Sequence, residues 1–391
     1  MNTPHQTKPK MYVQVVQHLS PGGIETMALE MAEEIERDST DQCYVISLEG
    51  DYQTAVAGWP RLKKHQERLI FLNKKPGWRL GTVWQLTQLF KQLKVDVVHS
   101  HHIGPLIYAG MAARMAGISG RIHTEHDAWH LQSRKRLWLE KLLLSMTKPN
   151  LVADANLVFA AMQQAGLTYP AQVICNGIDS RKFIAGDQQQ ALAAFGLTGW
   201  WQSAADSNHF HNDNADKNPA FKPVVLGCAG RLVTEKGYHI LLQAMQQLPE
   251  HYLLLIAGDG PLKITLQQQA QQLGIEHRVQ WLGAVNNMLP FYQALNIYTM
   301  ASLKEGLPLS PLEAQSCGIP VVLTDVGGCS EAICPATGYL SKPQCSKTLA
   351  TNLQNIMQVQ QRPADKNHSP RDFITQCRDL TVMVKAYQNL I

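Results

Sequence analysis

Short apolar runs alternate with longer amphipathic segments along most of the chain. The apolar runs are bounded by glycine or polar residues, which is typical of strands buried in a parallel sheet. The segment after Gly22-Gly23 instead places its apolar residues at helical spacing. This alternation predicts an α/β fold built from doubly wound parallel sheets. We expect strands at residues 12–16, 43–48, 69–72, 95–99, 121–124, 151–155, 172–175, 224–229, 252–257, 278–282, 297–300 and 320–324.

Helices are expected between these strands, notably at residues 159–165, 239–247 and 262–273, with a further amphipathic segment at 373–390. At 391 residues the chain exceeds the usual size of one domain, so we expect two domains with separate cores. The stretch Gly199–Lys222 interrupts the alternation. Its centre is polar and nearly free of aliphatic side chains, which predicts a disordered insertion. The histidines and aspartates in it lack the regular spacing of a metal site.

The composition is average for a globular protein, with a net charge of +4 and 17% charged residues. So small a charge gives no argument for binding nucleic acid, and no recognition motif for it occurs. The eight cysteines form no CxxC pair, which favours reduced thiols in a cytoplasmic protein. The segment Met1–Lys10 is polar, unlike a signal peptide. No apolar run approaches the roughly 18 residues of a membrane span.

The candidate chemistry centres on two carboxylates, Glu305 and Glu313, which lie on either side of a Gly/Pro turn. We expect Ser310 to cap a helix, Pro311 to lie in its first turn and Glu313 to occupy the capping-box position. A loop acid beside unpaired helix amides suits a ligand that carries hydroxyls and phosphate. A Ser310 and a Glu313 that merely cap each other would give the same pattern.

Two cations follow an apolar run upstream of this segment. Gly230-Arg231 comes directly after the expected strand 224–229, and Lys236-Gly237 follows shortly afterwards. The carboxyl edge of a parallel sheet is where α/β proteins bind ligands. Arg offers a planar fork for phosphate oxygens, and Lys offers a compact point charge. A second strand, 252–257, ends in the glycine turn Gly258-Asp259-Gly260-Pro261.

Together these motifs resemble the retaining family 4 glycosyltransferases of the GT-B fold. The resemblance extends to Gly22-Gly23 and Asn176-Gly177 and covers most of the chain from Met11 onward. It implies two Rossmann-like parallel-sheet domains that face each other across a cleft. Residues 1–178 would bind the acceptor and residues 179–373 a nucleotide sugar, with the insertion 199–222 in the second domain. A C-terminal helix, residues 374–391, would cross back to complete the first domain.

The resemblance also implies roles for individual residues. Arg231 and Lys236 would hold the diphosphate, Glu313 the ribose hydroxyls, and Glu305 the hydroxyls of the transferred sugar near C3. Gly22 and Gly23 would let the backbone of the first domain approach the β-phosphate. The expected donor-binding set is Gly22, Gly23, Gly230, Arg231, Lys236, Gly258, Gly306, Leu307, Pro308, Leu309 and Glu313, and the expected catalytic set is His126, Arg231, Lys236 and Glu305.

No metal and no cofactor are expected. No Asp-x-Asp motif occurs in the sequence, and two cations can neutralise a departing diphosphate without a metal. We identify no clear nucleophile for a double displacement. The resemblance implies a same-face substitution in which the departing phosphate accepts the proton of the acceptor.

Histidines cluster at the ends of two expected strands. His126 follows the strand 121–124, and the resemblance places a histidine at this position beside the donor sugar, although a histidine after a strand is more often a structural hydrogen-bonding residue. His99, His101 and His102 follow the strand 95–99. A His-x-His pair at a strand end can bind a metal, but no carboxylate partner is evident in the sequence.

Two segments of the N-terminal half interleave basic and aromatic residues, namely Lys74–Arg79 and Ser133–Lys141. Such segments suit an anionic membrane surface, where lipid-linked acceptors reside. A solvated helix face above a buried Leu stripe explains the second segment equally well. We expect a cytoplasmic protein. If the basic and aromatic segments bind a membrane, it would dock on the inner face of the plasma membrane.

The leading interpretation is a retaining, metal-independent glycosyltransferase. It would move a hexose from a UDP- or GDP-linked sugar to a lipid-linked or cell-surface glycan of the lipopolysaccharide or exopolysaccharide type. A two-domain oxidoreductase with a nucleotide cofactor is disfavoured because no Gly-x-Gly-x-x-Gly follows the first strand. A catalytically silent GT-B partner subunit is disfavoured because Arg231, Lys236, Glu305 and Glu313 are all present.

Overall fold

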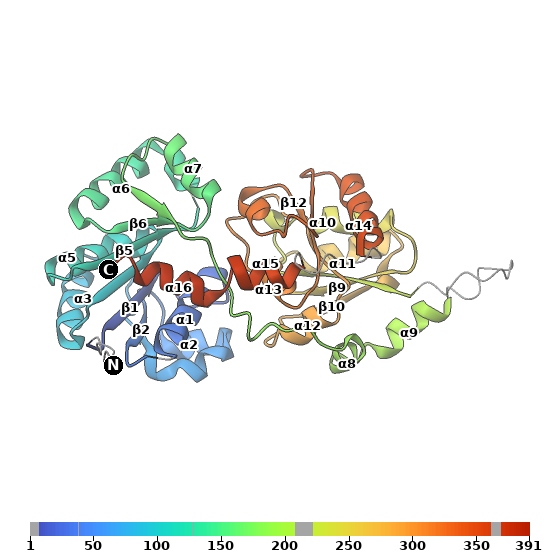
Figure 1. Cartoon of the computed structure of the whole chain (residues 1–391), viewed down its shortest axis with the longest axis horizontal. Helices are drawn as coiled ribbons and strands as arrows, with labels where there is room; N and C mark the ends of the chain where they lie inside the picture. Colours follow the sequence, from blue (N-terminus) through green and yellow to red (C-terminus); the bar gives the residue numbers. More distant parts are fainter. Residues whose placement is uncertain (1–7, 38, 128, 208–221, 361–368) are drawn as a thin grey trace, which may run out of the picture. The chain divides into compact units, whose positions relative to one another are not determined.

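The computed structural model of the protein describes residues 8–37, 39–127, 129–207, 222–360 and 369–391. The chain folds into two compact units, each described by itself below. Unit 1 comprises Met1–Gly177 and Leu380–Ile391, and unit 2 comprises Ile178–Asp379. Each unit has its own parallel sheet with helices packed on it (Figure 1).

Unit 1 contains a seven-stranded sheet in the order β3-β2-β1-β4-β5-β6-β7. All neighbouring strands run parallel, as the alternation of apolar runs and helices predicts. The strands are β1 Met11–Val16, β2 Gln42–Ser47, β3 Leu69–Phe71, β4 Val97–His101, β5 Gly120–Glu125, β6 Asn150–Ala153 and β7 Ala171–Val173. The α-helices are α1 Gly23–Glu36, α2 Tyr52–Gly58, α3 Leu80–Leu93, α4 Ile103–Pro105, α5 Met111–Met115, α6 Arg134–Thr147, α7 Asn156–Gln164 and α16 Leu380–Gln388.

Unit 2 contains a six-stranded parallel sheet in the order β10-β9-β8-β11-β12-β13. Its strands are β8 Val224–Ala229, β9 Tyr252–Ala257, β10 Val279–Gly283, β11 Ile297–Met300, β12 Val321–Thr324 and β13 Tyr339–Ser341. Its α-helices are α8 Gln188–Ala194, α9 Thr198–Ser207, α10 Tyr238–Gln246, α11 Lys263–Gln272, α12 Leu289–Gln293, α13 Ser310–Ser316, α14 Ser346–Gln360 and α15 Pro370–Cys377. The edge strand β13, Tyr339–Ser341, was not among the predicted strands.

The insertion differs from its prediction in its first part. Residues from Gly199 to Ser207 belong to helix α9, whereas the rest of the expected insertion, up to residue 221, lies outside the described residues. Two tryptophans explain the helix, since Trp200 and Trp201 are both partly buried and the Trp200 indole donates to the His277 carbonyl at 2.9 Å. The low content of aliphatic residues therefore misled the prediction, because aromatic side chains anchor this segment.

The C-terminal segment forms two helices instead of the single helix expected over 374–391. Helix α15 lies in unit 2 and packs on α13, whereas α16 lies in unit 1. Between them the backbone of Asp379 bridges to Ile178 in parallel, and the Ile178 amide donates to the Arg378 carbonyl at 2.9 Å. This extended pairing is incompatible with a continuous helix, so the helix is interrupted between α15 and α16, where Asp379 pairs with Ile178.

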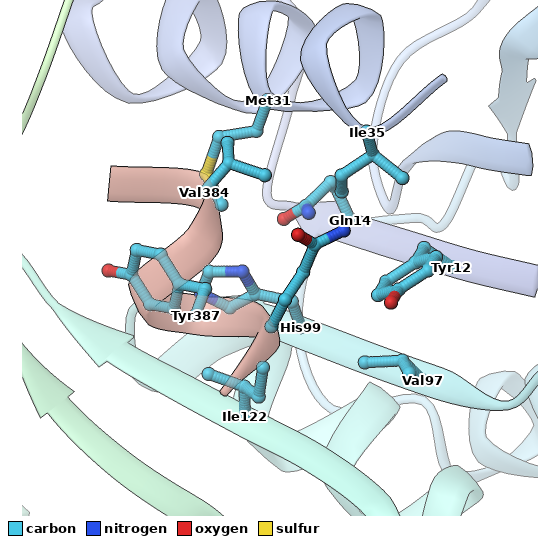
Figure 2. Close-up of a pocket in the computed structure, with 10 residues that line it drawn as sticks. Tyr12, Gln14, Met31, Ile35, Val97, His99, Ile122, Val384 and Tyr387 are labelled. Carbon is cyan, nitrogen blue, oxygen red and sulfur yellow. The ribbon is translucent and has the colours of Figure 1, made fainter. Parts of the chain in front are cut away.

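Helix α16 completes the core of unit 1 (Figure 2). Val384 and Tyr387 face Met31 of helix α1 and His99 of strand β4. The Tyr387 ring lies 4.8 Å from the His99 ring, and its hydroxyl pairs with Thr124 Oγ1 at 3.0 Å. The residues at the very end of the chain therefore stabilise the centre of the first sheet.

No helix among the described residues is both long and apolar enough to cross a bilayer.

Replacing Tyr387 should destabilise unit 1 selectively. Tyr387 is 3% exposed, so Tyr387→Ala is expected to lower the free energy of unfolding by about 3–5 kcal/mol, as for other buried aromatic side chains. Tyr387→Phe removes only the bond to Thr124 and should cost about 1 kcal/mol. Hydrogen exchange of the β1 and β4 peptides measures this, because it reports on unit 1 separately from unit 2.

A matched control is Tyr52→Phe, which removes an exposed hydroxyl bond to Gln66 and should leave protection unchanged. Equal protection of β1 and β4 in wild type and Tyr387→Ala would show that α16 does not support the sheet.

Candidate active site

The strand order fixes where each unit can bind a ligand. In unit 2 the chain moves outward in one direction from β8 through β9 to β10, and in the other from β11 to β13. The loops after β8 and β11 therefore diverge and leave a crevice at the carboxyl ends of the strands. Arg231, Lys236 and Glu305 all lie in these two loops. Unit 1 has the same arrangement, with its divergence between β1 and β4.

Two glycines bring the ends of β8 and β9 into direct backbone contact. Gly230 and Gly258 have φ angles of 150° and 152°, a region that L side chains rarely adopt. A Cβ on Gly258 would lie 1.9 Å from the Gly230 carbonyl oxygen. The Gly230 amide also donates to the Ala257 carbonyl at 3.0 Å. Both positions therefore require glycine, and the loop that carries Arg231 leaves the sheet from a fixed point.

Lys236 and Glu305 form an ion pair in this structure. Lys236 Nζ donates to Glu305 Oε1 at 2.6 Å, and Ser302 Oγ donates to the same oxygen at 2.7 Å. The side chains are 28% and 9% exposed, so the pair is partly desolvated. Arg231 is exposed, and among the described residues its guanidinium has neither a hydrogen bond nor an ion pair. The sequence did not indicate that Lys236 and Glu305 contact each other.

The capping role predicted for Ser310 and Glu313 is wrong. Helix α13 begins at Ser310 itself, Leu309 precedes it as the N-cap residue, and no side chain caps the helix. Ser310 Oγ accepts from the Tyr298 hydroxyl at 2.7 Å instead. Glu313 accepts a hydrogen bond from the hydroxyl of Tyr292.

The physical reason is the burial of the two phenols. Tyr292 and Tyr298 are both fully buried, and a buried hydroxyl without a partner is costly. Burial, followed by the charge of Glu313, raises the pKa of Tyr292 well above its usual value, so the phenol remains a donor. These tertiary demands outweigh local capping, and they leave Glu313 at the start of α13 as a half-buried carboxylate held by Tyr292.

The loop between the two glutamates is held from below. The Gly306 carbonyl accepts from the Gly328 amide at 2.8 Å, and Gly327 adopts a φ of 53° directly against the Glu305 carbonyl. Leu307 and Pro308 are buried, whereas Gly306 and Leu309 are half-buried. The backbone that follows Glu305 is therefore rigidly supported.

In unit 1, Gly22 and Gly23 lie exposed at the start of helix α1, at the carboxyl end of β1. A Cβ on Gly22 would lie 2.2 Å from a carboxylate oxygen of Glu25. Glu25 in turn lies 3.7 Å from His18 Nε2. The Glu25 carboxylate therefore lies against Gly22, in the space that a side chain there would fill.

His126 belongs to a buried polar network that we call the His101 cluster: Gln14, His101, His126, Asp154 and Asn176, each 5% exposed or less. His101 pairs with Gln14 Oε1 at 2.9 Å and with His126 Nε2 at 3.0 Å. His126 Nδ1 lies 3.0 Å from Asp154 Oδ2, which also accepts from Asn176 at 2.9 Å. Both ring nitrogens of His126 are therefore engaged inside unit 1.

The His101 cluster has a consistent direction of hydrogen bonding. Gln14 Oε1 can only accept, so His101 donates through Nε2 and accepts at Nδ1 from His126. His126 Nδ1 is then an acceptor, which requires a protonated Asp154 as its donor. Burial raises the pKa of Asp154 well above its usual range and lowers that of His126 to about 3, as this arrangement needs.

Sequence reasoning identified His101 and His126 as candidates but missed their partners Gln14 and Asp154. Asp154 directly follows strand β6, so the rule that found His126 after β5 could also have found Asp154. Gln14 lies inside β1, where only the register of β1 beside β4 brings it to His101.

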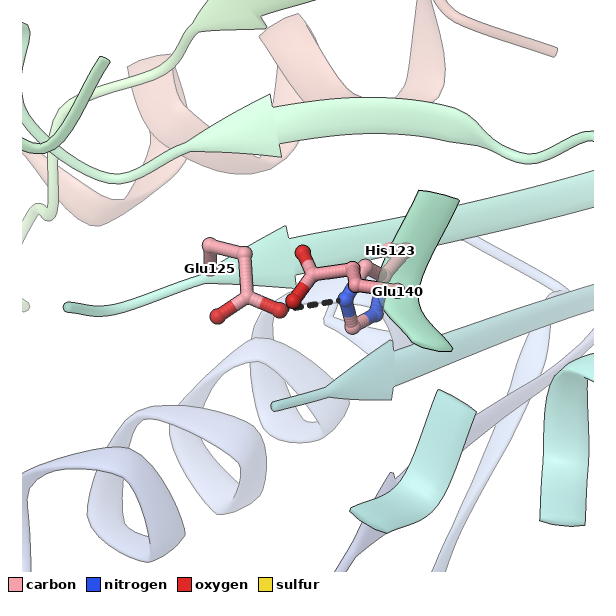
Figure 3. Close-up of side chains that lie close together, drawn as sticks. All are labelled: His123, Glu125 and Glu140. Atoms are coloured by element: carbon pink, nitrogen blue, oxygen red, sulfur yellow. Dashed lines mark hydrogen bonds and ion pairs between the residues drawn. The ribbon is translucent and has the colours of Figure 1, made fainter. Parts of the chain in front are cut away.

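A second group of histidines and carboxylates, which the sequence did not reveal as partners, lies on the face of the sheet opposite the His101 cluster. His123, Glu125 and Glu140 are buried, and one ligand atom of each lies within 4.8 Å of the others (Figure 3). With His130 we call them the Glu125 cluster. Burial alone would raise the pKa of Glu125, but the nearby His102, 3.8 Å from Oε2, and the hydrogen bond with His123 hold it well below its ordinary value.

The neighbouring His130 has the opposite shift. Burial alone would lower its pKa, but the hydrogen bonds to Asp127 and Glu140 and the charge of Glu125 raise it to about 10. His99 instead pairs with Thr124 at 2.8 Å, and His101 pairs with Gln14 and His126. Within the described part of the chain, neither member of the His-x-His pair is hydrogen-bonded to a carboxylate.

Two parallel-sheet α/β domains, with the second carrying cations and carboxylates at its switch point, are the architecture of GT-B glycosyltransferases. A solved structure of Anabaena HepE in complex with UDP and glucose has this fold, with a TM-score of 0.78 and 22% identity over 97% of this chain and 98% of that one. The model of glycosyltransferase family 4 matches residues 21–182, and the model of glycosyl transferases group 1 matches residues 211–371. Together they span well over half of the sequence, so the chain belongs to the GT-B glycosyltransferases of the family 4 type.

Curated relatives agree with this membership. The lipopolysaccharide core biosynthesis mannosyltransferase LpsB of Rhizobium meliloti is 30% identical over 275 residues, which are 68% of this chain and 65% of LpsB. An Escherichia coli α-1,3-galactosyltransferase that acts with UDP-Gal on GlcNAc-diphosphoundecaprenol is 27% identical over 267 residues, 62% of this chain and 61% of the relative. The alignments thus span slightly less than two thirds of these two relatives.

Gly258→Ala should perturb unit 2 strongly. The new methyl group would collide with the Gly230 carbonyl, and the left-handed φ adds strain of about 1–2 kcal/mol. Overpacking at such a site costs a further 1–3 kcal/mol or so, and we expect a clear loss of unfolding free energy in urea titration. Gly199→Ala is the control, because nothing lies within 4 Å of a Cβ there. Equal stability of the two variants would contradict the close contact of the β8 and β9 ends.

Proposed function

We propose that this protein transfers a hexose from a nucleoside-diphosphate sugar to a lipid-linked or cell-surface glycan, with retention of anomeric configuration and without a metal in the transfer step. The observation that carries the proposal is the Lys236–Glu305 pair at the switch point of the second sheet, in the same loop region as Arg231, whose guanidinium has no partner within the described part of the chain. HepE, which shares the fold, was solved with UDP and with UDP-glucose.

The ion pair suits a donor that carries both phosphate and hydroxyls. A diphosphate between Lys236 and Arg231 would compete with Glu305 for the ammonium group. Glu305 would then be released to accept hydrogen bonds from the sugar hydroxyls, with Ser302 holding its Oε1. Before binding, the same pairing keeps both charges compensated in a partly desolvated place.

The developing charge on the leaving diphosphate is the main energetic problem of the reaction. Preorganised cations neutralise it without reorganisation, which is how Arg231 and Lys236 would replace a metal. The departing phosphate would take the acceptor's proton on the same face of the sugar. No free enzyme base is needed for this route.

Glu313 is placed for the ribose of the donor. Tyr292 holds one of its oxygens from within the core, which fixes the side chain at the start of α13. The carboxylate can accept from vicinal hydroxyls in a way that a neutral side chain cannot. The supported backbone at Gly306, Leu307, Pro308 and Leu309 would line the sugar pocket.

In unit 1, the exposed backbone at Gly22 and Gly23 would approach the β-phosphate closely, as the resemblance implies. His126 would act through its position in the His101 cluster, because its ring nitrogens are already engaged. We therefore assign His126 to positioning the loop beside the donor sugar, and Asp154 to holding His126.

We further propose that an exposed face of unit 1 docks on an anionic membrane, where a lipid-linked acceptor resides. Helix α6 buries Leu143 and Leu144 but exposes Trp138, Leu142 and Met146, which are spaced one turn apart on a single stripe. Arg134, Lys135 and Lys141 are exposed beside this stripe. A helix with a buried Leu face does not need a second apolar face, so the stripe favours the membrane interpretation.

Helix α5 packs against both α6 and α3, and it extends this face. The exposed large apolar side chains of these three helices are Leu80, Trp84, Met115, Trp138, Leu142 and Met146, and Trp78 is exposed just before α3. The basic segment Lys74–Arg79 contributes less than its sequence indicates. Lys74 is buried, with its Nζ 2.8 Å from Glu49, so only Lys75 and Arg79 are exposed cations there. The proposed location is the inner face of the plasma membrane.

A thermal-shift screen of UDP, GDP, ADP, NAD and their sugar conjugates, with EDTA present, tests the donor. One nucleoside diphosphate at a hundred times its Kd should raise the unfolding free energy by about 2.7 kcal/mol. We expect UDP or GDP to do so. Stabilisation by NAD alone would overturn the transferase proposal in favour of an oxidoreductase.

Substitutions at Lys236 and Glu313 test whether this site binds the donor and carries out the transfer. Lys236→Ala should lower the transfer rate by about 10²–10³-fold, the usual cost of losing one stabilising donor. Glu313→Gln keeps an acceptor for Tyr292 and should weaken nucleotide affinity with little change in stability. The matched control is Lys263→Ala, which removes an exposed cation from a pair with Asp259. A transfer rate that Lys236→Ala leaves intact would remove this site from the reaction.

Co-sedimentation with phosphatidylglycerol vesicles tests the membrane proposal. Binding is expected at low salt and should be lost at high salt, because each basic residue near an anionic surface contributes about 1 kcal/mol. Trp138→Ser with Leu142→Ser should abolish it. Ile264→Ser is the control, since Ile264 is equally exposed at 70% but lies in unit 2. Equal losses in both variants, or no binding by wild type, would refute docking through α6.

A further inference from the structure

Two carboxylates face each other in the interior of unit 1, on the side of the sheet opposite helix α16. Glu125 ends strand β5 and Glu140 lies in the middle of helix α6, and both side chains are 0% exposed. Figure 3 shows the Glu140 carboxylate beside that of Glu125, with the His123 ring next to both. Buried carboxylates at this separation need a compensating positive charge.

The surrounding donor atoms form a compact set. His123 Nε2 lies 2.7 Å from Glu125 Oε1, and His130 Nε2 lies 2.6 Å from Glu140 Oε2 and 3.8 Å from Glu125 Oε2. A tetrahedral zinc ion holds nitrogen and oxygen ligands roughly 3.3 Å apart. The observed separations lie on both sides of this value, so small side-chain movements would open the set around one ion.

His123 presents Nε2 to this set, at 2.7 Å from Glu125 Oε1. Its Nδ1 lies 3.2 Å from the Ser100 carbonyl oxygen, which can only accept a hydrogen bond, and 2.9 Å from Ser100 Oγ, which can donate. Without a metal, Nε2–H donates to Glu125 Oε1 and Nδ1 accepts from Ser100 Oγ. With a metal on Nε2, the ring would take the other tautomer, and Nδ1–H would donate to the Ser100 carbonyl. A metal ligand whose far nitrogen is fixed by a carbonyl is the usual second-shell arrangement of histidine at zinc sites.

Two buried oxygens in the cluster have no hydrogen-bond partner among the described residues. They are Glu125 Oε2 and Glu140 Oε1. An unpaired buried oxygen of a charged group is costly, so each points to a missing partner. Hydrogen bonds between the histidines and the carboxylates alone leave both of these oxygens unsatisfied.

We propose that the Glu125 cluster binds one zinc ion, with His123 Nε2, His130 Nε2, Glu125 and Glu140 as ligands. A mixed set of imidazole nitrogens and carboxylate oxygens favours zinc over magnesium or calcium, which prefer oxygen alone. His130 has the matching second-shell partner, because its Nδ1 lies 3.6 Å from Asp127 Oδ1. His102, at 3.8 Å from Glu125 Oε2 and 32% exposed, lies outside the ligand set.

The ion has a structural role in this arrangement. It ties the end of β5 to α6 and to His130. It lies in unit 1, whereas the diphosphate-binding cations Arg231 and Lys236 belong to unit 2. The zinc proposal does not rest on the identity of the donor.

Metal analysis of the full-length protein tests this. The chain is stripped with a chelator, reloaded with Zn²⁺, separated from excess metal by gel filtration and measured by mass spectrometry. We expect about one zinc per chain, and a higher melting temperature than that of the stripped protein. Loading with Co²⁺ should give the visible absorption of a tetrahedral site.

Glu140→Gln should lower zinc retention by at least about tenfold. Glu250→Gln is the matched control, since it alters a His–Glu pair of 3.3 Å that is exposed. Because loss of a buried carboxylate can prevent folding, His130→Gln, at a side chain 11% exposed, repeats the test, with circular dichroism as the check of folding.

Two results would overturn the proposal. One is a wild-type protein that retains less than about a tenth of an equivalent of zinc after loading and shows neither a thermal shift nor a cobalt spectrum. The other is zinc retained at the wild-type level by both folded variants, because the metal would then lie elsewhere in the chain. Neither result depends on whether UDP or GDP binds, so failure of the zinc site and failure of the transferase proposal are distinguishable.

Discussion

The strand order of the two parallel sheets is the constraint on which the rest of the structure depends. In each sheet the first strand lies in the interior, the next two strands extend the sheet on one side, and the remaining strands extend it on the other. The loops after the two adjacent interior strands, β1 and β4 or β8 and β11, therefore diverge. Every candidate site residue therefore lies in a loop, or at the start of a helix, that follows the carboxyl end of a strand. Gly22 follows β1, Arg231 follows β8 and Glu305 follows β11. The sheets supply rigidity, and the loops supply the chemistry.

Within this frame, the need to satisfy buried polar groups decides how individual side chains are used. Tyr292 and Tyr298 bring hydroxyls into the core of unit 2, and they take Glu313 and Ser310 as partners. Lys236 and Glu305 compensate each other in the same way. Three of the residues proposed to bind the donor, Lys236, Glu305 and Glu313, are therefore held by partners within unit 2 in this structure. The Lys236–Glu305 pair is partly exposed, as the proposed exchange for a phosphate requires.

Much of the fold was predictable because apolar runs of four to six residues mark parallel strands directly, and Val224–Ala229 and Tyr252–Ala257 lie where the pattern indicated. The capping box at Ser310 failed because its competitors, two tyrosines, lie outside the local pattern. The break between α15 and α16 was hidden for a similar reason, since the backbone pairing with Ile178 depends on a segment about 200 residues away. Local patterns predict elements well, whereas the partners of polar side chains are set by tertiary structure.

Strand β5 shows how one period-two pattern creates two different environments. Thr124 faces His99 and Tyr387 on one side, whereas His123 and Glu125 face Ser100 and Glu140 on the other. Side chains adjacent in sequence therefore belong to separate networks with opposite electrostatics. On the α16 side, neutral imidazoles link Gln14 to a protonated Asp154; on the α6 side, carboxylates collect beside histidines. His126 directly follows Glu125 in sequence but bonds to His101 and Asp154, so it belongs to the network on the α16 side. A sequence motif of alternating histidines and acids is consequently best analysed face by face, because its members do not share one site.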